Sequence, residues 1–135
     1  NVLSALSSAQ ETLLVTMPTS PAIADALKTK LVAQRLGSKV MGVVINFVMG
    51  EKGEISKQEA AGILELPVLG IVPFDAEVRK SFMQQKVAPV SLRKTSSDAA
   101  REFQKIASRL TGIKVAESKI ENQGFFSKLF GKFKK

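Results

Sequence analysis

The amino-acid sequence predicts an α/β fold, part of a doubly wound, mainly parallel sheet, followed by an amphipathic helix at the C-terminus. Two observations predict the sheet: short, nearly continuous apolar runs typical of buried strands, and helical patterns that alternate with them. A third observation predicts the terminal helix, because the last twelve residues combine phenylalanine with lysine and contain no acid. The alternation of strands and helices indicates parallel βαβ units.

Runs rich in branched aliphatic residues predict strands at residues 13–16, 40–47 and 68–72. Pro, Gly or Asn residues bound each run, as is common at the ends of strands. Apolar runs of this kind belong to strands that are buried on both faces. We therefore expect helices to cover the sheet on both sides.

Two helices are expected between the strands. A Ser-Pro pair at 20–21 predicts a helix with Ser as its N-cap and Pro at its first position, and Gly37 ends this helix. Ser56 and Glu59 are three residues apart and fit a capping box, which predicts a helix through Leu64.

Two further helices are expected after the third strand. Asp75 can cap a helix that runs to about Gln84. Ser96 or Ser97 can open another helix, whose apolar residues recur at helical spacing until Gly112.

The composition bounds the possible chemistry. The chain has 135 residues, a formal net charge of +8 and neither His nor Cys. Without these residues it lacks the usual zinc ligands, the base of a Ser-His-Asp triad and thiol nucleophiles. No apolar run is long enough to span a bilayer and no signal peptide is recognisable. We expect a cytoplasmic protein that is peripheral on the inner face of the cell membrane.

Half of the net charge lies in the last twelve residues. Residues 1–123 carry 16 basic and 12 acidic side chains, whereas residues 124–135 carry four lysines, no acid and four of the eight phenylalanines. A basic surface for nucleic acid would spread its charge over the domain. We therefore expect no specific nucleic-acid partner.

Plotted at about 100° per residue, the final segment forms a helix with two distinct faces. The apolar face contains Phe125, Phe126, Leu129, Phe130 and Phe133, and the lysines are Lys128, Lys132, Lys134 and Lys135. The alternative is a terminal helix that docks on its own domain. Bulky Phe, cations without acids and a polar tether at 112–123 favour binding to an anionic membrane surface.

The magnitudes predict weak and reversible membrane binding by a single tail. Four lysines contribute at most about 4 kcal/mol, at roughly 1 kcal/mol each. The partly inserted apolar side chains add to this, and ordering a short helix opposes it. Two tails on a dimer would bind far more tightly through their effective concentration.

The ends of the predicted strands are the expected ligand sites, because open α/β sheets bind ligands beyond the carboxyl ends of their strands. These ends are residues 16–18, Asn46 and residues 73–75. The amide of Asn46 can donate and accept a hydrogen bond at once, which suits the edge of an adenine ring, and a turn or cap is the alternative. Asp75 by itself is better explained as a helix N-cap.

The segments LLVTMPTSPAIADA, VMGVVIN, ELPVLGIVPFD and FFSKLFGKFKK together resemble the C-terminal half of a MinD-like ATPase. This is the MinD/ParA family of deviant Walker P-loop NTPases. The resemblance implies a sheet of the P-loop NTPase type, ATP as cofactor with Mg²⁺ in the complete protein, and a homodimer with ATP that binds membrane. It also implies a role in intracellular positioning, such as division-site selection, and a regulatory protein partner.

The resemblance assigns roles to four residues. Asn46 matches the family Asn that hydrogen-bonds adenine, and Pro73 and Asp75 match a Pro-x-Asp turn that lines the base pocket. Asp25 matches an Asp on the face associated with dimerisation and regulator contact.

The sequence also departs from the family pattern. It contains no G-x-x-x-x-G-K-[ST] phosphate loop, so the lysine for the phosphates and the hydroxyl for Mg²⁺ are missing. The acidic switch residues of the family are also missing, and Met17 and Thr19 replace more usual residues around Pro18. We expect the C-terminal portion of a longer ATPase that does not hydrolyse ATP alone. Residues 1–111 would belong to the ATPase domain, 112–123 to the tether, and 124–135 to the membrane helix.

Two alternative functions stay open. The chain could be a non-catalytic module that binds membrane or a partner without nucleotide. It could also belong to a related ATPase for flagellar number control or metal-cofactor insertion, because one fold serves many functions.

Overall fold

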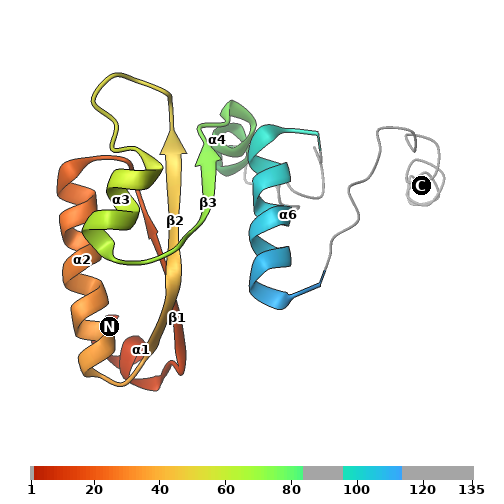
Figure 1. Ribbon diagram of the computed structural model, residues 1–135. Coiled ribbons are helices and arrows are strands. Elements are labelled where there is room, and N and C mark those ends of the chain that lie inside the picture. Colours follow the sequence, from red (N-terminus) through yellow and green to blue (C-terminus); the bar gives the residue numbers. More distant parts are fainter. Residues whose placement is uncertain (1, 84–95, 114–135) are drawn as a thin grey trace, which may run out of the picture.

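The computed structural model describes residues 2–83 and 96–113 of the chain. Its elements are α1 (Val2–Ser8), β1 (Glu11–Thr16), α2 (Ser20–Arg35), β2 (Lys39–Val48), α3 (Lys57–Leu64), β3 (Val68–Pro73), α4 (Ala76–Met83) and α6 (Asp98–Thr111) (Figure 1). The predicted membrane helix at 124–135 and most of the tether at 112–123 lie outside the described residues, as does the expected end of α4 at Gln84. Within the described ranges, no helix is both long and apolar enough to cross a membrane.

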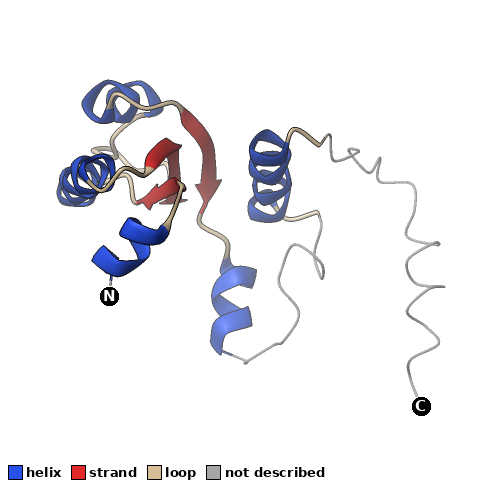
Figure 2. Cartoon of the chain, turned by 90° about the horizontal axis from the view of Figure 1, so that it is seen from below, coloured by secondary structure: helices blue, strands red, loops and turns tan. Residues whose placement is uncertain are grey.

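The three strands form a parallel sheet, which confirms the predicted direction of the strands, and their order in the sheet is β1-β2-β3. Helices α2 and α3 cover one face of this sheet, and α6 packs on the other face at β3 (Figures 1 and 2). Each strand extends beyond its predicted run by one or two residues. Helices on both faces of a parallel sheet are the arrangement that continuous apolar strands predict.

The central strand β2 contributes to both layers of the core. Val43 and Ile45 are buried on one face of the sheet, in a cluster with Leu64 of α3. Val44 is buried on the other face, in a cluster with Ile106 of α6. Because successive side chains of a strand point to opposite faces, one aliphatic run fills both cores.

The N-cap of α2 is Thr19, so the prediction of Ser20 as the cap is wrong by one residue. The carbonyl of Thr19 accepts the first helical hydrogen bond, from the Ile23 amide at 2.9 Å. The N–H groups of the first helical turn have no helical partner, so proline fits its second position as well as its first. Pro21 is therefore compatible with Ser20 as the first residue of the helix. The predicted end is confirmed by Gly37, which has a φ of 81° directly after the C-cap.

The capping box of α3 is confirmed. The Glu59 amide donates to Ser56 Oγ at 3.2 Å, and the Ser56 amide donates to Glu59 Oε2 at 2.8 Å. The Glu59 carboxylate is itself hydrogen-bonded to Ser56. Its bond with the Ser56 side chain is the larger cause, and its bond with the Ser56 backbone the smaller one, of a carboxyl pKa below the usual range. The corresponding cap of α6 is Ser97 rather than Ser96, because Ser97 Oγ accepts from the Ala100 amide at 3.1 Å.

A buried lysine joins the two helices on one face of the sheet. Lys30 of α2 is only 6% exposed, and its Nζ donates to the carbonyl oxygen of Leu64 at 2.8 Å. The same Nζ lies 3.5 Å from Glu65 Oε2. A cation at a helix C-terminus satisfies carbonyls that have no helical partner. Lys30 therefore fixes the end of α3 against α2.

Helix α6 packs closely on β3 where the strand has a glycine. A Cβ added at Gly70 would overlap the side chain of Ile106. Arg109 reinforces this contact by donating from Nη1 to the carbonyl oxygen of Leu69. The absence of a side chain at Gly70 therefore sets the position of α6 on the sheet.

We predict that Gly70→Ala destabilises the protein by about 1–3 kcal/mol, because the added methyl group has no space beneath α6. The matched control is Gly62→Ala in α3, where a Cβ would meet nothing within 4 Å. The control should be neutral or stabilising by up to about 1 kcal/mol, since Ala favours helix over Gly. Urea unfolding measures both changes, and equal midpoints for the two variants would contradict the close packing of α6.

Candidate functional site

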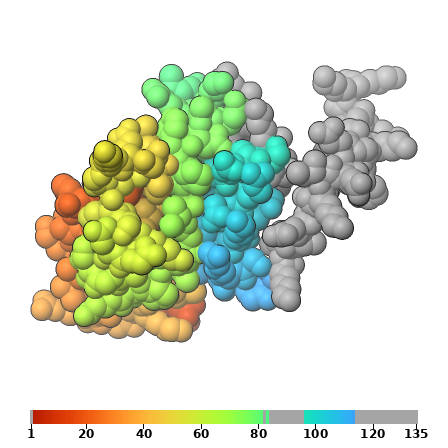
Figure 3. Space-filling model, turned by 45° about the horizontal axis from the view of Figure 1, so that its top comes forward, coloured from red at the N-terminus to blue at the C-terminus, as the bar shows by residue number. Residues whose placement is uncertain are grey.

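Hydrogen bonds tie together the three loops at the carboxyl ends of the strands. The Ile55 amide, before α3, donates to the carbonyl oxygen of Pro18, after β1, at 2.9 Å. The Phe74 amide, after β3, donates to the carbonyl oxygen of Val48, at the end of β2, at 2.9 Å. Figure 3 turns this edge forward and shows the β2–α3 loop in yellow beside the residues around the end of β3 in green. The sheet edge that the sequence predicts as a ligand site is thus a connected surface.

A β-bulge lies at the carboxyl end of β2. Between two register pairs, Ile45 with Ile71 and Val48 with Pro73, β2 has one residue more than β3. Phe47 lies in this bulge and has a φ of 63°. A bulky side chain in the left-handed region costs about 1–3 kcal/mol and is found mostly where the surroundings impose it, often at functional sites. Bulges change the direction of side chains beside such sites.

The ring of Phe47 contacts the ring of Phe74, which follows β3. Their centroids are 4.9 Å apart and the ring planes meet at 64°, an edge-to-face geometry. Phe47 is nevertheless 47% exposed. The carboxyl edge therefore presents an aromatic pair that is held in place and partly open to solvent.

The loop after β2 is closed by a carboxylate. Glu54 accepts the Met49 amide at 2.8 Å with one oxygen and the Gly50 amide at 2.9 Å with the other. Gly50 has a φ of 75°, which a glycine adopts readily. Two charge-assisted hydrogen bonds hold the start of this loop next to the bulge of β2.

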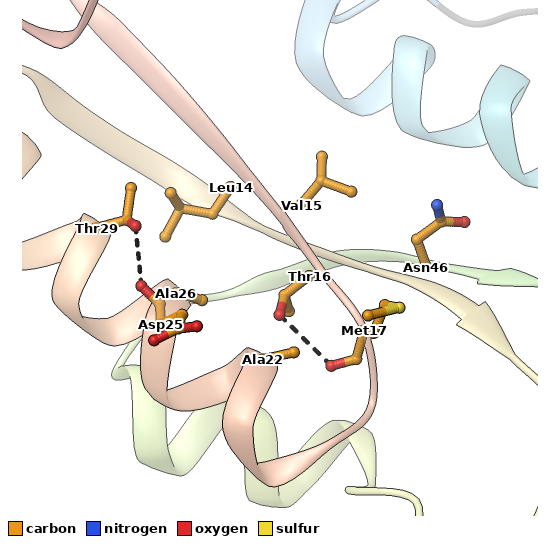
Figure 4. A pocket seen from close by; sticks show the side chains of 9 residues that line it. All are labelled: Leu14, Val15, Thr16, Met17, Ala22, Asp25, Ala26, Thr29 and Asn46. Carbon is orange, nitrogen blue, oxygen red and sulfur yellow. Dashed lines mark hydrogen bonds between the residues drawn. The ribbon is translucent and has the colours of Figure 1, made fainter. Parts of the chain in front are cut away.

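A hollow of about 370 Å³ lies along β1 (Figure 4). Its lining residues come from β1, the segment after it, α2 and β2, and they are Leu14, Val15, Thr16, Met17, Ala22, Asp25, Ala26, Thr29 and Asn46. Figure 4 shows Asp25 and Asn46 on different sides of the β1 ribbon. Both predicted site residues therefore line this hollow from different sides of β1, although they are 21 positions apart in the sequence.

The predicted base-pocket residues occupy two neighbouring strand ends. Asn46 is half-buried, and its side chain has no hydrogen bond to any residue in the described ranges. Pro73 is the last residue of β3, and Asp75 Oδ1 accepts the Glu77 amide at 2.8 Å, as an N-cap of α4 does. Neither Pro73 nor Asp75 lines the hollow along β1. The N-cap interpretation of Asp75 is confirmed, whereas contact of these residues with a base stays a prediction.

Asp25 lies on the exposed surface of α2. Its Oδ1 accepts a hydrogen bond from Lys28 Nζ at 3.1 Å, and both side chains are about three-quarters exposed. Its carbonyl oxygen also accepts from Thr29 Oγ1 at 2.9 Å. The carboxylate is therefore accessible to a partner, and its role at a dimer or regulator surface stays a prediction.

Sequence reasoning missed the aromatic pair and the closing carboxylate. A signal for the pair was present, because Phe47 directly follows Asn46 and Phe74 directly follows Pro73. Phenylalanine after two successive strand ends indicates a shared aromatic surface once the strands are taken as parallel neighbours. Glu54 gave no such signal, since a lone acid in a loop has many possible partners.

The outer edge of β1 pairs with no strand among the described residues. Close to this edge, Val15 is 61% exposed and Met17 is 50% exposed. Unpaired backbone groups beside exposed apolar side chains are an edge that proteins normally cover. In the described residues β3 is also an edge strand, but α6 packs on it, whereas exposed apolar side chains lie beside β1.

No protein-family model matches the chain. Among curated proteins, an uncharacterized ATP-binding protein of Methanocaldococcus jannaschii is 36% identical over 133 residues, which cover 95% of this chain and 50% of that protein. The crystal structure of the cell division ATPase MinD of Pyrococcus furiosus has a TM-score of 0.75 and 28% identity, over 83% of this chain and 46% of that chain. The septum site-determining protein MinD of Pyrococcus horikoshii, complexed with Mg-ADP, has a TM-score of 0.70 and 26% identity, over 79% and 44% of the two chains.

The fold and these similarities define an α/β protein whose parallel sheet is of the P-loop NTPase type. Within this class the chain is MinD/ParA-like, which confirms the resemblance found in its sequence. The chain spans about half the length of the curated relatives and solved structures that it matches.

We predict that Glu54→Ala opens the loop after β2, because the Met49 and Gly50 amides lose their acceptor. Hydrogen exchange of these two amides should become about ten-fold faster or more, which corresponds to the loss of a hydrogen bond to a charged group. Glu51→Ala is the control in the same exposed loop, and it should leave both amides unchanged. Equal exchange in the two variants would show that Glu54 does not hold the loop.

Proposed function

We propose that this chain supplies the adenine pocket of a MinD/ParA-type ATPase, with Asn46 bound to the edge of the base. The observation that carries the proposal is the position of Asn46 at the carboxyl edge of a MinD-like sheet, where it lines a hollow and its side-chain amide is accessible, with no hydrogen bond to the described residues. Ligands of open α/β sheets bind at this edge. ATP-binding relatives support the choice of nucleotide.

The chemistry of Asn46 suits adenine. A primary amide offers a donor and an acceptor side by side, and adenine presents its exocyclic amino group next to ring nitrogens that accept. A pair of such hydrogen bonds fixes the base in one orientation. Guanine and uracil present an adjacent donor and acceptor in the reverse order, so an Asn46 amide held in the orientation that suits adenine disfavours them.

Pro73 and Asp75 support the pocket by shaping the turn after β3. Pro73 ends the strand with a fixed φ, and Asp75 holds the first turn of α4 through its hydrogen bond with the Glu77 amide. We propose that this rigid turn forms a wall of the base pocket. In this proposal Asp75 acts mainly by holding the backbone.

The phosphates and Mg²⁺ need residues that these 135 do not supply. The sequence contains no phosphate-loop motif, and the described part of the chain holds no group of three or more His, Cys, Asp or Glu residues arranged for a metal ion. The residues present therefore fit the base and do not fit the metal. We propose that the phosphate-binding part of the ATPase joins the sheet at the open edge of β1, beside Asn46.

The surface around Asp25 is proposed as the contact for a second copy or a regulatory protein. It is accessible, it carries the exposed ion pair of Asp25 with Lys28, and Asp25 lines the same hollow as Asn46. A partner bound there would lie close to the nucleotide and could respond to it. Homodimerisation with ATP would also bring two C-terminal tails to one membrane.

The last twelve residues are proposed to bind an anionic membrane as an amphipathic helix. Their sequence combines a phenylalanine-rich face with four lysines and no acid. Reversible attachment of a nucleotide-dependent dimer suits a role in intracellular positioning, such as selection of the division site. A non-catalytic membrane-binding module is the second candidate, favoured by the missing phosphate loop.

The base pocket is tested by Asn46→Ala in the full-length natural protein that contains these residues. ATP should bind about 5- to 150-fold more weakly, because a paired hydrogen bond to a base is worth about 1–3 kcal/mol. The preference for ATP over UTP should fall by a similar factor. Isothermal titration calorimetry measures both, with Asn122→Ala as the matched control. An unchanged affinity and preference would mean that Asn46 is only a residue of the strand end.

The membrane helix is tested by sedimentation with vesicles of anionic phospholipid. A chain that ends at Gln123, or Phe130→Glu, should lose most of its binding, because the truncation removes the apolar face and the glutamate places a charge within it. Phe103→Glu is the matched control, since Phe103 lies on α6 and is already 40% exposed. Binding that survives the truncation would exclude the tail as the anchor. Membrane binding without any ATP binding by the full-length protein would favour the non-catalytic module.

A further inference from the structure

We infer that Phe47 stacks on the flat face of the purine whose edge Asn46 binds, and that Phe74 braces it. This inference rests on the proposed adenine pocket and adds a residue to it. The two phenylalanines are joined by their edge-to-face contact, with centroids 4.9 Å apart. Phe47 retains 47% of its surface in solvent, which leaves ring area for a ligand.

The backbone at Phe47 is the first reason to assign it a function. Single exposed apolar side chains are common on protein surfaces and need no special explanation. Phe47, however, adopts a φ of 63°, which an aromatic residue rarely does. Glycine would occupy this conformation more easily, so a phenylalanine here carries a backbone cost that its neighbours must offset.

The bulge of β2 is the second reason. In a regular strand, neighbouring side chains point to opposite faces, so Asn46 and Phe47 could not both contact one ligand. The extra residue between the register pairs Ile45 with Ile71 and Val48 with Pro73 interrupts that alternation. The bulge therefore removes the geometric barrier to a shared ligand at consecutive positions.

The supports of Phe47 are the third reason. The Phe74 amide donates to Val48, next to Phe47, and Glu54 closes the loop that follows. An aromatic group that is fixed before binding loses little conformational freedom when a base stacks on it. These contacts hold the ring at the sheet edge without covering it.

The two residues would divide the recognition of the base. Stacking on an aromatic ring depends little on which base is bound, because every base has a π face. Phe47 should therefore contribute affinity for purine nucleotides in general, whereas Asn46 should contribute the preference for adenine. Substitutions of Phe47 should therefore lower the affinity for both ATP and GTP, whereas substitutions of Asn46 should lower the preference for ATP.

The test compares Phe47→Leu, Phe47→Trp and Phe47→Gly in the full-length natural protein. Leu removes the π face and keeps apolar bulk, Trp keeps an aromatic face, and Gly removes the side chain while fitting the positive φ. Titration calorimetry measures the affinities for ATP, GTP and inorganic tripolyphosphate, which has no base. Phe103→Leu on α6 is the matched control, because it is an exposed phenylalanine away from the strand ends.

Phe47→Leu and Phe47→Gly should weaken the binding of ATP and GTP by about 5- to 100-fold, while tripolyphosphate binding and the control stay unchanged. Phe47→Trp should retain the wild-type affinity for ATP. The Gly variant separates stacking from folding, since it relieves the strained backbone and still lacks the ring. Normal ATP affinity in both the Leu and Gly variants would overturn the inference.

The outcomes also separate this inference from the proposed pocket. If Asn46→Ala weakens ATP binding and the Phe47 variants do not, the adenine pocket stands and the stacking residue does not. If folded wild-type protein binds ATP no better than tripolyphosphate, the pocket itself is wrong and the inference fails with it. Equal weakening of tripolyphosphate and ATP in Phe47→Leu would indicate a disturbed fold and would also count against stacking.

Discussion

The rest of the structure depends on the central position of β2. Its backbone pairs in parallel with strands on both edges, and its side chains enter the core on both faces, Val43 and Ile45 on one and Val44 on the other. A parallel pair cannot be joined by a tight turn, so each connection must cross a face of the sheet, and the helices in those connections bury the aliphatic side chains. Lys30 and Gly70 then fix individual helices, the first by capping α3 and the second by admitting α6.

The carboxyl edge combines rigidity with local strain. Hydrogen bonds between the loops after β1, β2 and β3 make one surface of three segments that are far apart in the sequence. Within that surface, the bulge of β2 carries a phenylalanine at positive φ and an asparagine amide with no hydrogen bond to the described residues. Strain that the surroundings hold in place is found mostly at functional sites, and the Asn46 amide is accessible to a ligand.

The two edge strands of the sheet, β1 and β3, differ in how they are covered. In the described ranges neither β1 nor β3 has a partner strand on its outer side. Helix α6 packs on β3, whereas Val15 and Met17 beside β1 are exposed. The chain also spans about half the length of its relatives. A nucleotide needs contacts to its base and to its phosphates, and the residues present fit the base alone. The open edge beside Asn46 is where the remaining contacts would have to enter.

The sequence by itself determined the order of strands and helices, the capping box at Ser56, the helix end at Gly37 and the family resemblance. These features are encoded within a few neighbouring residues, because periodicity, caps and motifs act along one element. Only the tertiary structure decided the bulge at Phe47, its pairing with Phe74, the burial of Lys30 and the common hollow of Asp25 and Asn46. Each of these depends on register and packing between distant segments, and the sequence specifies such contacts only through the energy of the whole fold.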